Sequence, residues 1–386
     1  MAGLTHRERA LKALNHEETD RVPIDMGGLS QTGINVVPYK GLIKLLKLEK
    51  EAGESALEDG SNTRGMARPT EAVLKALDVD FRGVAPGAAE ETPIRWLDAD
   101  NYIDEWGVLW SRIPGHPFIA KKGPFEDREP SFQDLDKFKW PDPDDPGRTR
   151  GLRAQVEKLR RETDCAIVLN LPYCVVREHH RLRGFAEGLA DLLANPELSQ
   201  AIMERATEIS SRLARAALRE IGDLVDVVSF AEDMGTQEQP FMRPELYRRL
   251  VKPYHRRFVE AIKASTHAKV AIHSDGAIYD LIPDFIDIGI EALNPVQLSA
   301  RGMGDTKRLK REFGQHLTFW GAIDTHRVLP FGKPADVVAE VKRRIDDLAQ
   351  GGGYVVGSVH TINAEVPPEN VAAMLETART YRLART

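Results

Sequence analysis

The chain has 386 residues, of which 42% are hydrophobic, so it is long enough to bury a large core. Its formal net charge is −6 with both signs spread along the sequence, which argues against a nucleic-acid partner. Two cysteines exclude a disulfide framework, residues 1–17 lack the apolar core of a signal peptide, and no apolar run of about 18 residues occurs, so we expect a cytoplasmic protein with no membrane partner.

Short apolar runs alternate with amphipathic helical stretches along the whole chain. Several of these runs are almost wholly apolar, as strands buried on both faces must be. The predicted strands are residues 22–25, 81–84, 166–170, 225–230, 269–273, 290–294, 317–320 and 353–357. Eight strand–helix repeats predict a closed parallel sheet, that is, an α/β fold of the (β/α)8 TIM-barrel type.

Two regions interrupt this repeat in the N-terminal half. Residues 27–70 are predicted to be a helical insertion with a short helix at 37–48. Residues 92–95 and 105–112 are typical of a small antiparallel excursion, and 114–146 of a loop rich in Pro, Asp and Phe. Neither region is apolar enough to fold independently, so we expect residues 1–386 to form a single barrel domain with N-terminal helical and β-hairpin elaborations.

The helices of the C-terminal half are marked by prolines at their first turns. Asn195 and Pro196 begin a helix that continues towards residue 220. Further helices are predicted from Pro244 to about 265, from Pro334 to about 350, and from Pro368 onward.

Polar residues follow most of the predicted strands. In a parallel barrel the carboxyl ends of the strands carry the function, and the opposite ends carry stability. The candidates at the carboxyl ends are Asn170, Glu232, Asp233, His273, Asp275, Asn294, Gln297 and His360.

His273 and Asp275 are two positions apart at a strand end, so their side chains project the same way. His360 follows the last strand and is expected to reach the same point. Two histidines and a carboxylate are the ligand set of catalytic zinc sites with an open position. The alternative is structural: Asp275 caps the next helix, Gly276 eases the turn, and His273 makes a hydrogen bond.

The remaining strand-end residues have a functional and a structural interpretation each. Asp233 and Glu232 are candidates for a general base or a further metal ligand; otherwise one orients a loop backbone or pairs with an arginine, an alternative favoured for Glu232. Asn294 and Gln297, with Asn170, are candidates for holding a cofactor or substrate, and a purely structural turn is the other interpretation.

These motifs give the chain a resemblance to the uroporphyrinogen decarboxylase superfamily over nearly its whole length. The residues that carry it are 7–9, 20–24, 232–237, the His-Ser-Asp-Gly turn at 273–276, 294–297, 321–325 and 366–370. The resemblance implies the same barrel fold.

The superfamily contains decarboxylases of uroporphyrinogen and methyltransferases that use zinc and a corrinoid. The decarboxylases carry an Arg-Gln-Ala-Gly-Arg segment after the first strand, whereas residues 26–32 here contain no arginine. They also have a substrate-binding Asp after the second strand, which residues 82–87 do not offer. A tetrapyrrole with eight carboxylates needs several cationic partners, so the comparison favours the methyltransferase branch.

Those methyltransferases hold zinc with His-x-Cys after strand five and a Cys after strand eight. The match places His273 on the histidine, Asp275 on the first cysteine and His360 near the second. The resemblance therefore implies a zinc-dependent methyltransferase that moves a methyl group from a small, for example methoxylated, compound to a corrinoid (cobalamin) on a small corrinoid protein. A uroporphyrinogen-type decarboxylase and a non-catalytic barrel that binds a tetrapyrrole or a partner remain the alternatives. The oligomeric state is left open, with a homodimer as the state considered.

Overall fold

The computed structural model describes residues 3–53, 65–113 and 118–383, and its main element is a seven-stranded parallel sheet. The strands follow one another in chain order: β1 (Phe81–Val84), β6 (Ala166–Asn170), β7 (Val227–Ala231), β8 (Lys269–His273), β9 (Ala292–Asn294), β10 (Thr318–Ile323) and β11 (Tyr354–Ser358). Three of the predicted strands have the predicted bounds, and four are shifted at one or both ends by up to three residues. The prediction of an α/β fold with a parallel sheet is confirmed.

The sheet is strongly curled. A single buried cluster contains a side chain from every one of the seven strands, including Phe81 of β1, Ala271 of β8 and Val355 of β11. The rings of Phe81 in β1 and Trp320 in β10 lie 4.4 Å apart between centroids, so strands at opposite sides of the sheet order meet across the curl. Ala10 and Leu14 of α1 (His6–Leu14) belong to the same cluster, so this helix covers one end of the enclosed core.

The first predicted strand, residues 22–25, is present as a single parallel bridge from Ile24 to Val356 and not as a strand. Asp25 N–H donates to the Val356 carbonyl at 2.8 Å, and Asp80 N–H donates to the Ile24 carbonyl at 2.9 Å. The segment thus lies between β11 and the start of β1. The ladder is incomplete because Pro23 has no N–H and the N–H of Ile24 donates to the side chain of Asp80.

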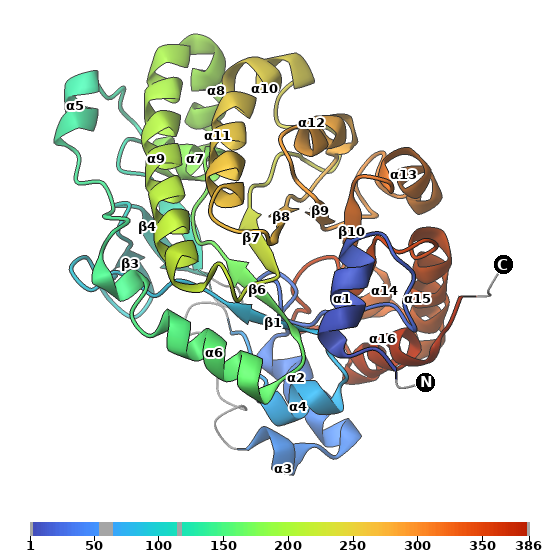
Figure 1. Cartoon of the computed structure of the whole chain (residues 1–386). Helices are drawn as coiled ribbons and strands as arrows, with labels where there is room; N and C mark the ends of the chain where they lie inside the picture. Colours follow the sequence, from blue (N-terminus) through green and yellow to red (C-terminus); the bar gives the residue numbers. More distant parts are fainter. Residues whose placement is uncertain (1–2, 54–64, 114–117, 384–386) are drawn as a thin grey trace.

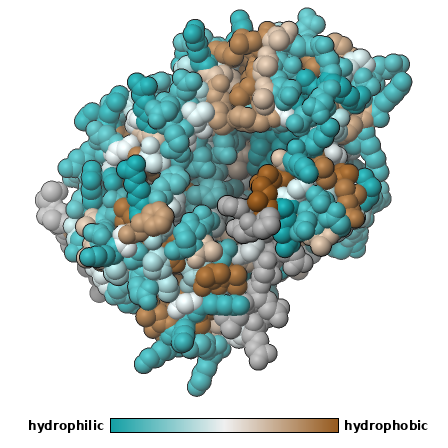
Figure 2. Space-filling model, turned by 180° about the vertical axis from the view of Figure 1, so that it is seen from behind, coloured by the Kyte–Doolittle hydropathy of each residue, from teal (hydrophilic) through white to brown (hydrophobic). Residues whose placement is uncertain are grey.

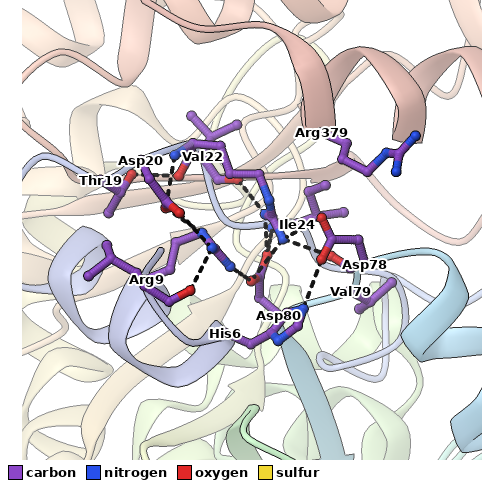
Figure 3. Close-up of polar contacts among 12 residues, drawn as sticks. His6, Arg9, Thr19, Asp20, Val22, Ile24, Asp78, Val79, Asp80 and Arg379 are labelled. Atoms are coloured by element: carbon purple, nitrogen blue, oxygen red, sulfur yellow. Dashed lines mark hydrogen bonds and ion pairs between the residues drawn. The ribbon is translucent and has the colours of Figure 1, made fainter. Parts of the chain in front are cut away.

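An ion-pair network holds this segment at the amino ends of the strands (Figure 3). Asp80 is fully buried and accepts hydrogen bonds from Arg9 at 2.8 Å and from Arg21 at 2.6 Å. Asp20 also pairs with Arg9, and Asp78 pairs with His6 and Arg21. The carboxylate of Asp80, together with those of Asp20 and Asp78, offsets the charges of the two buried arginines. This pairing is what makes their burial tolerable.

Helices pack on the outside of the sheet (Figure 1). The long helix α9 lies beside α11, α15 lies beside α16, and the two termini lie on the same side of the molecule (Figure 1). Besides α1, the helices are α2 (Val36–Leu46), α3 (Glu49–Ala52), α4 (Glu71–Ala76), α5 (Phe132–Lys137), α6 (Leu152–Glu162), α7 (Val176–Arg183), α8 (Phe185–Ala194), α9 (Pro196–Ile221), α10 (Pro244–Leu250), α11 (Lys252–Lys263), α12 (Ile282–Asp287), α13 (Thr306–Phe313), α14 (Val328–Phe331), α15 (Pro334–Leu348) and α16 (Pro368–Thr380), with short 3-10 turns at Pro146–Arg148 and Tyr279–Leu281.

The helix starts that prolines mark agree with the structure, and Asn195 caps α9 with its side chain. The single helix predicted from Pro244 to about 265 is wrong, because the structure has two helices, α10 and α11, that meet at Val251. Pro253 lies in the first turn of α11, where its missing N–H breaks the preceding helix and costs nothing to the new one.

The N-terminal elaborations are larger than predicted. The antiparallel excursion is a four-stranded sheet of β2 (Arg95–Trp96), β3 (Asn101–Ile103), β4 (Leu109–Arg112) and β5 (Phe118–Lys122), so the predicted loop at 114–146 contains a strand and the helix α5. Residues 54–64 of the predicted insertion and 114–117 of the predicted loop lie outside the described residues. Among the helices of the described part, none is long and apolar enough to cross a membrane.

Candidate functional site

The three predicted metal ligands converge at the carboxyl ends of the strands. His273 is the last residue of β8, Asp275 lies in the turn that follows it, and His360 lies two residues after the end of β11. One ligand atom from each lies within 4.8 Å of the others. The rings of His273 and His360 are 5.4 Å apart between centroids. Residues 87 positions apart in sequence are therefore brought to one point by the curl of the sheet.

The site is buried on one side and open on the other. The His273 side chain is 3% exposed, Asp275 is 29% exposed, and His360 is exposed. Figure 2 shows a hollow near the middle of the rear face of the molecule, with hydrophilic residues on its walls. A buried ligand beside an exposed one leaves room for a second molecule to approach.

The orientation of the His273 ring is set by Asn294. His273 Nδ1 and Asn294 Oδ1 are 2.6 Å apart, and the Asn294 amide donates through Nδ2 to the Trp320 carbonyl at 3.2 Å. Nε2 of His273 therefore points the other way, to the carboxylates of Asp275 at 3.5 Å and Asp233 at 3.9 Å.

The turn after β8 is held by groups from two neighbouring strand ends. Gly276 N–H donates to Gln297 Oε1 at 2.6 Å, and Asp275 N–H donates to Asp233 Oδ1 at 3.0 Å. Gly276 has a φ of 98°, and a Cβ there would lie 2.2 Å from the carbonyl oxygen of Gly235, so only glycine fits. The backbone N–H groups of Asp275 and of the next residue are thus both held by hydrogen bonds, which fixes the position of Asp275.

The charges of His273 and Asp275 stabilise each other. Burial lowers the pKa of His273, but the hydrogen bond and charge of Asp275, with the charge of Asp233, raise it above its usual value. Burial raises the pKa of Asp275, but His273 and then His360 lower it below its usual value. The carboxylate of Asp275 thus faces two imidazoles, with the carboxylate of Asp233 nearby, and two imidazoles with a carboxylate are a ligand set for a divalent cation.

Glu232 and Asp233 are adjacent in sequence but have different surroundings. Glu232 is fully buried, and its carboxylate accepts the N–H groups of Val175 at 2.8 Å and Val176 at 3.1 Å at the start of α7. Burial raises its pKa, but the hydrogen bond and charge of His255, the N–H of Val175 and the charge of Arg177 lower it to about 2. The structural interpretation holds for Glu232, whereas Asp233 is 53% exposed and faces the site.

The three residues predicted to hold a cofactor make hydrogen bonds within the protein. Asn170 accepts the N–H of Ser30 at 3.0 Å and donates to the carbonyl of Gly28 at 2.9 Å, so it fixes the loop after residues 22–25. Asn294 and Gln297 support the turn that carries His273 and Asp275. Each of the three thus has a structural role, and whether any of them also holds a cofactor stays a prediction.

Two groups of polar residues near the strand ends lie outside the predicted set of site residues. The buried carboxylate of Asp25 accepts hydrogen bonds from Gly28 N–H, Thr32 and Trp320. At the exposed rim, Ser299 Oγ lies 3.1 Å from Gln237 Oε1 and 2.9 Å from His326 Nδ1. Asp25 ends the first predicted strand, so the rule that identified the other strand-end residues applies to it too.

Among the described residues, one other group could hold a metal by its ligand types: His6, Asp164 and Cys165. Both ring nitrogens of His6 already pair with carboxylates, those of Asp78 and Asp164, each at 2.9 Å. Burial raises the pKa of the Cys165 thiol to about 11, so the thiolate that a metal needs is disfavoured. This group precedes β6 and lies at the opposite ends of the strands.

Comparison with known proteins agrees with this architecture. The profile of the family described as Uroporphyrinogen decarboxylase (URO-D) matches residues 117–381, more than half of the chain. A solved structure titled methyltransferase from Methanosarcina mazei superposes with a TM-score of 0.66 over 97% of this chain and 98% of that chain, at 18% identity, which shows a shared fold. A hyperthermophilic beta-glucosidase from Pyrococcus furiosus reaches a TM-score of 0.36 at 12% identity over 60% of this chain and 69% of its own. No curated protein matches the sequence.

Proposed function

Because the chain belongs to the uroporphyrinogen decarboxylase (URO-D) family, we propose that it is a metal-dependent methyltransferase of that family. The observation that carries the proposal is the convergence of His273, Asp275 and His360, whose ligand atoms lie within 4.8 Å of one another. The methyl donor would be a small methylated compound, and the acceptor a corrinoid bound to a small separate protein.

The donor set fits zinc. His273 Nε2, a carboxylate oxygen of Asp275 and a ring nitrogen of His360 would hold the ion, and the exposed side of the site would leave a position for the substrate. Nitrogen and oxygen ligands make zinc a stronger Lewis acid than thiolates do, so when bound it would polarise the heteroatom of an ether or amine donor. A methoxylated aromatic compound is therefore the class of donor that we expect.

The residues around these ligands have separate tasks. Asn294 holds the His273 ring, and Gln297 holds the turn that carries Asp275. Asp233 is exposed with its carboxylate 3.9 Å from His273 Nε2, so it is placed either to exchange a proton with the donor's heteroatom or to act as a fourth ligand. A variant Asp233→Asn that loses turnover but keeps its metal would assign the proton role.

The proposal also completes the fold. Residues 22–25 would act as the eighth member of a closed (β/α)8 barrel within a single domain, since they hydrogen bond to β11 on one side and to Asp80 on the other. In a closed barrel the loop of residues 26–32 would lie beside the site. The corrinoid would approach through the single opening at the carboxyl ends of the strands.

The loop of residues 26–32 bears on the decarboxylase alternative. It contains no arginine or lysine, and the nearby Arg21 is buried with Asp80 at the amino ends of the strands. This loop therefore offers no cationic partner to a substrate with eight carboxylates. A non-catalytic binding barrel would have no need of a preformed ligand set.

The test joins metal content to methyl transfer. Protein purified without chelator is analysed for zinc, and methylation of cob(I)alamin is followed by absorbance with a panel of methoxylated aromatic donors. We expect one zinc per chain, lost in His273→Ala and in His360→Ala. His267→Ala is the matched control, because His267 is exposed and precedes the other end of β8.

Two results would overturn the proposal. One is the absence of stoichiometric metal in the unmodified protein, together with an unchanged activity in His273→Ala. The other is loss of carboxyl groups from uroporphyrinogen without any methyl transfer, which would establish the decarboxylase.

A further inference from the structure

The strongest unassigned relationship near the site joins His273 to Asn294. The two residues are direct partners in the parallel pairing of β8 and β9, and both are buried. Asn294 also contacts the carbonyl of Trp320 in β10, so its amide spans three neighbouring strands. Side chains that the sheet itself holds in this way have little freedom to reorient.

The hydrogen bonds of the Asn294 amide determine which way round it lies. Its Nδ2 lies 3.2 Å from the Trp320 carbonyl oxygen, which can only accept. If the amide were turned over, its oxygen would face that carbonyl, and two acceptors would be buried against each other. The oxygen of Asn294 therefore faces His273, at 2.6 Å from Nδ1.

An acceptor at this distance requires a proton on Nδ1 of His273. The neutral imidazole has one N–H and one lone pair, so the lone pair is then on Nε2. Nε2 is the nitrogen that faces Asp275 and Asp233, whose carboxylates favour the doubly protonated ring, so Nε2 carries its lone pair only once the pH exceeds the pKa of the ring or a cation takes the place of that proton. Gly321 allows the arrangement, since a Cβ there would lie only 3.2 Å from Asn294 Nδ2 and 3.0 Å from the Ser358 carbonyl oxygen.

We propose that Asn294 is a positioning residue that locks His273 in the Nδ1–H tautomer, so that Nε2 is always the atom presented to a ligand. This inference rests on the proposed metal site, and it adds the group that sets the tautomer and direction of its buried histidine. The free-energy cost of fixing the orientation of the His273 ring is incurred when the protein folds and not when the metal binds. Loss of a partner of this kind weakens metal binding by roughly 10–100-fold.

The first test needs no substitution. Histidine labelled with ¹⁵N in the metal-free protein at a pH where the ring is neutral reports the tautomer through the shifts of Nδ1 and Nε2. The chain has eleven histidines, so His273→Gln identifies the signals of His273. We expect a protonated Nδ1 and an unprotonated Nε2. The opposite tautomer, or a mixture of the two, would overturn the proposal.

The second test compares three variants in both tautomer and zinc affinity, the latter by competition with a chromophoric chelator. Asn294→Leu has a similar shape but no acceptor, and we expect a mixed tautomer and about 10–100-fold weaker zinc binding. Asn294→Asp keeps the acceptor towards Nδ1 but places its second oxygen against the Trp320 carbonyl, so we expect the Nδ1–H tautomer in a less stable protein. Gln297→Leu removes the hydrogen bond of Gly276 and loosens the same turn, but it leaves the contact between Asn294 and His273. We therefore expect an unchanged tautomer in this control.

The outcomes separate this inference from the proposed function. A locked tautomer that Asn294→Leu releases, in a protein that binds no zinc, would retain the role of Asn294 and reject the metal site. If the protein binds zinc and Asn294→Leu has the same tautomer as the unmodified protein, the metal site is retained and the role of Asn294 is rejected.

Discussion

The indole N–H of Trp320 donates to the buried carboxylate of Asp25 at 2.8 Å and so joins the segment before β1 to β10. The two residues are 295 positions apart in sequence. Their contact crosses the space enclosed by the sheet, because β11 lies between β10 and residues 22–25. Burial raises the pKa of Asp25, and its hydrogen bonds from Thr32, Gly28 and Trp320 act against that rise.

Replacing Trp320 should destabilise the protein through a lost hydrogen bond and lost core packing. In Trp320→Phe the buried carboxylate of Asp25 loses one donor and the core loses part of a ring's volume, and we expect the free energy of unfolding to fall by at least about 1–3 kcal/mol. Urea denaturation measures it. The matched control is Trp96→Phe in the small sheet, where the side chain is half exposed and a change within about 0.5 kcal/mol is expected. Equal effects in the two variants would show that the bond to Asp25 contributes nothing.

Substitutions at the adjacent residues Glu232 and Asp233 should have different effects, one on stability and the other on activity. Glu232→Gln replaces a carboxylate that caps α7, so we expect a loss of about 1–3 kcal/mol in the free energy of unfolding. Asp233→Asn changes an exposed side chain, so stability should stay within about 0.5 kcal/mol while methyl transfer falls. Denaturation and the cob(I)alamin assay on both variants check this. Full activity in Asp233→Asn would remove Asp233 from the mechanism.

Stability at low pH should depend on Asp78. Burial raises its pKa, but the hydrogen bond from His6 and the charge of Arg21 lower it to about 2. A carboxyl group with a lowered pKa in the folded state stabilises the protein above its unfolded pKa of about 4, and this contribution is lost as the pH falls from about 4 to about 2. His6, whose pKa is raised, is protonated throughout that range.

The contribution of Asp78 amounts to about 1 kcal/mol once its partial exposure to solvent is allowed for. Asp78→Asn is the variant to compare, since the residue has a φ of 60°, which asparagine tolerates well. We expect the unfolding free energy of the variant to change less between pH 4 and pH 2 than that of the unmodified protein. Parallel acid curves for the two proteins would contradict this role.

Removal of metal should lower the melting temperature through one site only. A ligand at one hundred times its Kd stabilises the folded state by about 2.7 kcal/mol, so a chelator should lower the Tm of the unmodified protein measurably. His360→Ala should not respond, because the ligand set at the carboxyl ends of the strands is incomplete. Cys165→Ala should respond like the unmodified protein. The reverse pattern would place the metal at His6, Asp164 and Cys165.

What the sequence by itself determined was local. Apolar runs identified seven strands, prolines and Asn195 identified helix starts, and alternation placed His273 and Asp275 on one side of a strand end. These features depend on neighbours within a few residues, and periodicity and backbone preference report on those directly. The motifs also carried the family resemblance that the sequence profile confirms.

The tertiary structure decided everything that depends on contacts across the sheet. It made Glu232 a helix cap and left Asp233 at the site, and it turned the amide of Asn294 towards His273. It also brought His360 to within reach of His273, and replaced the first predicted strand by a bridge beside Asp80. The reason is physical: strand register and the curl of the sheet choose the partner of each polar group, and residues far apart in the chain carry no local signal of that choice.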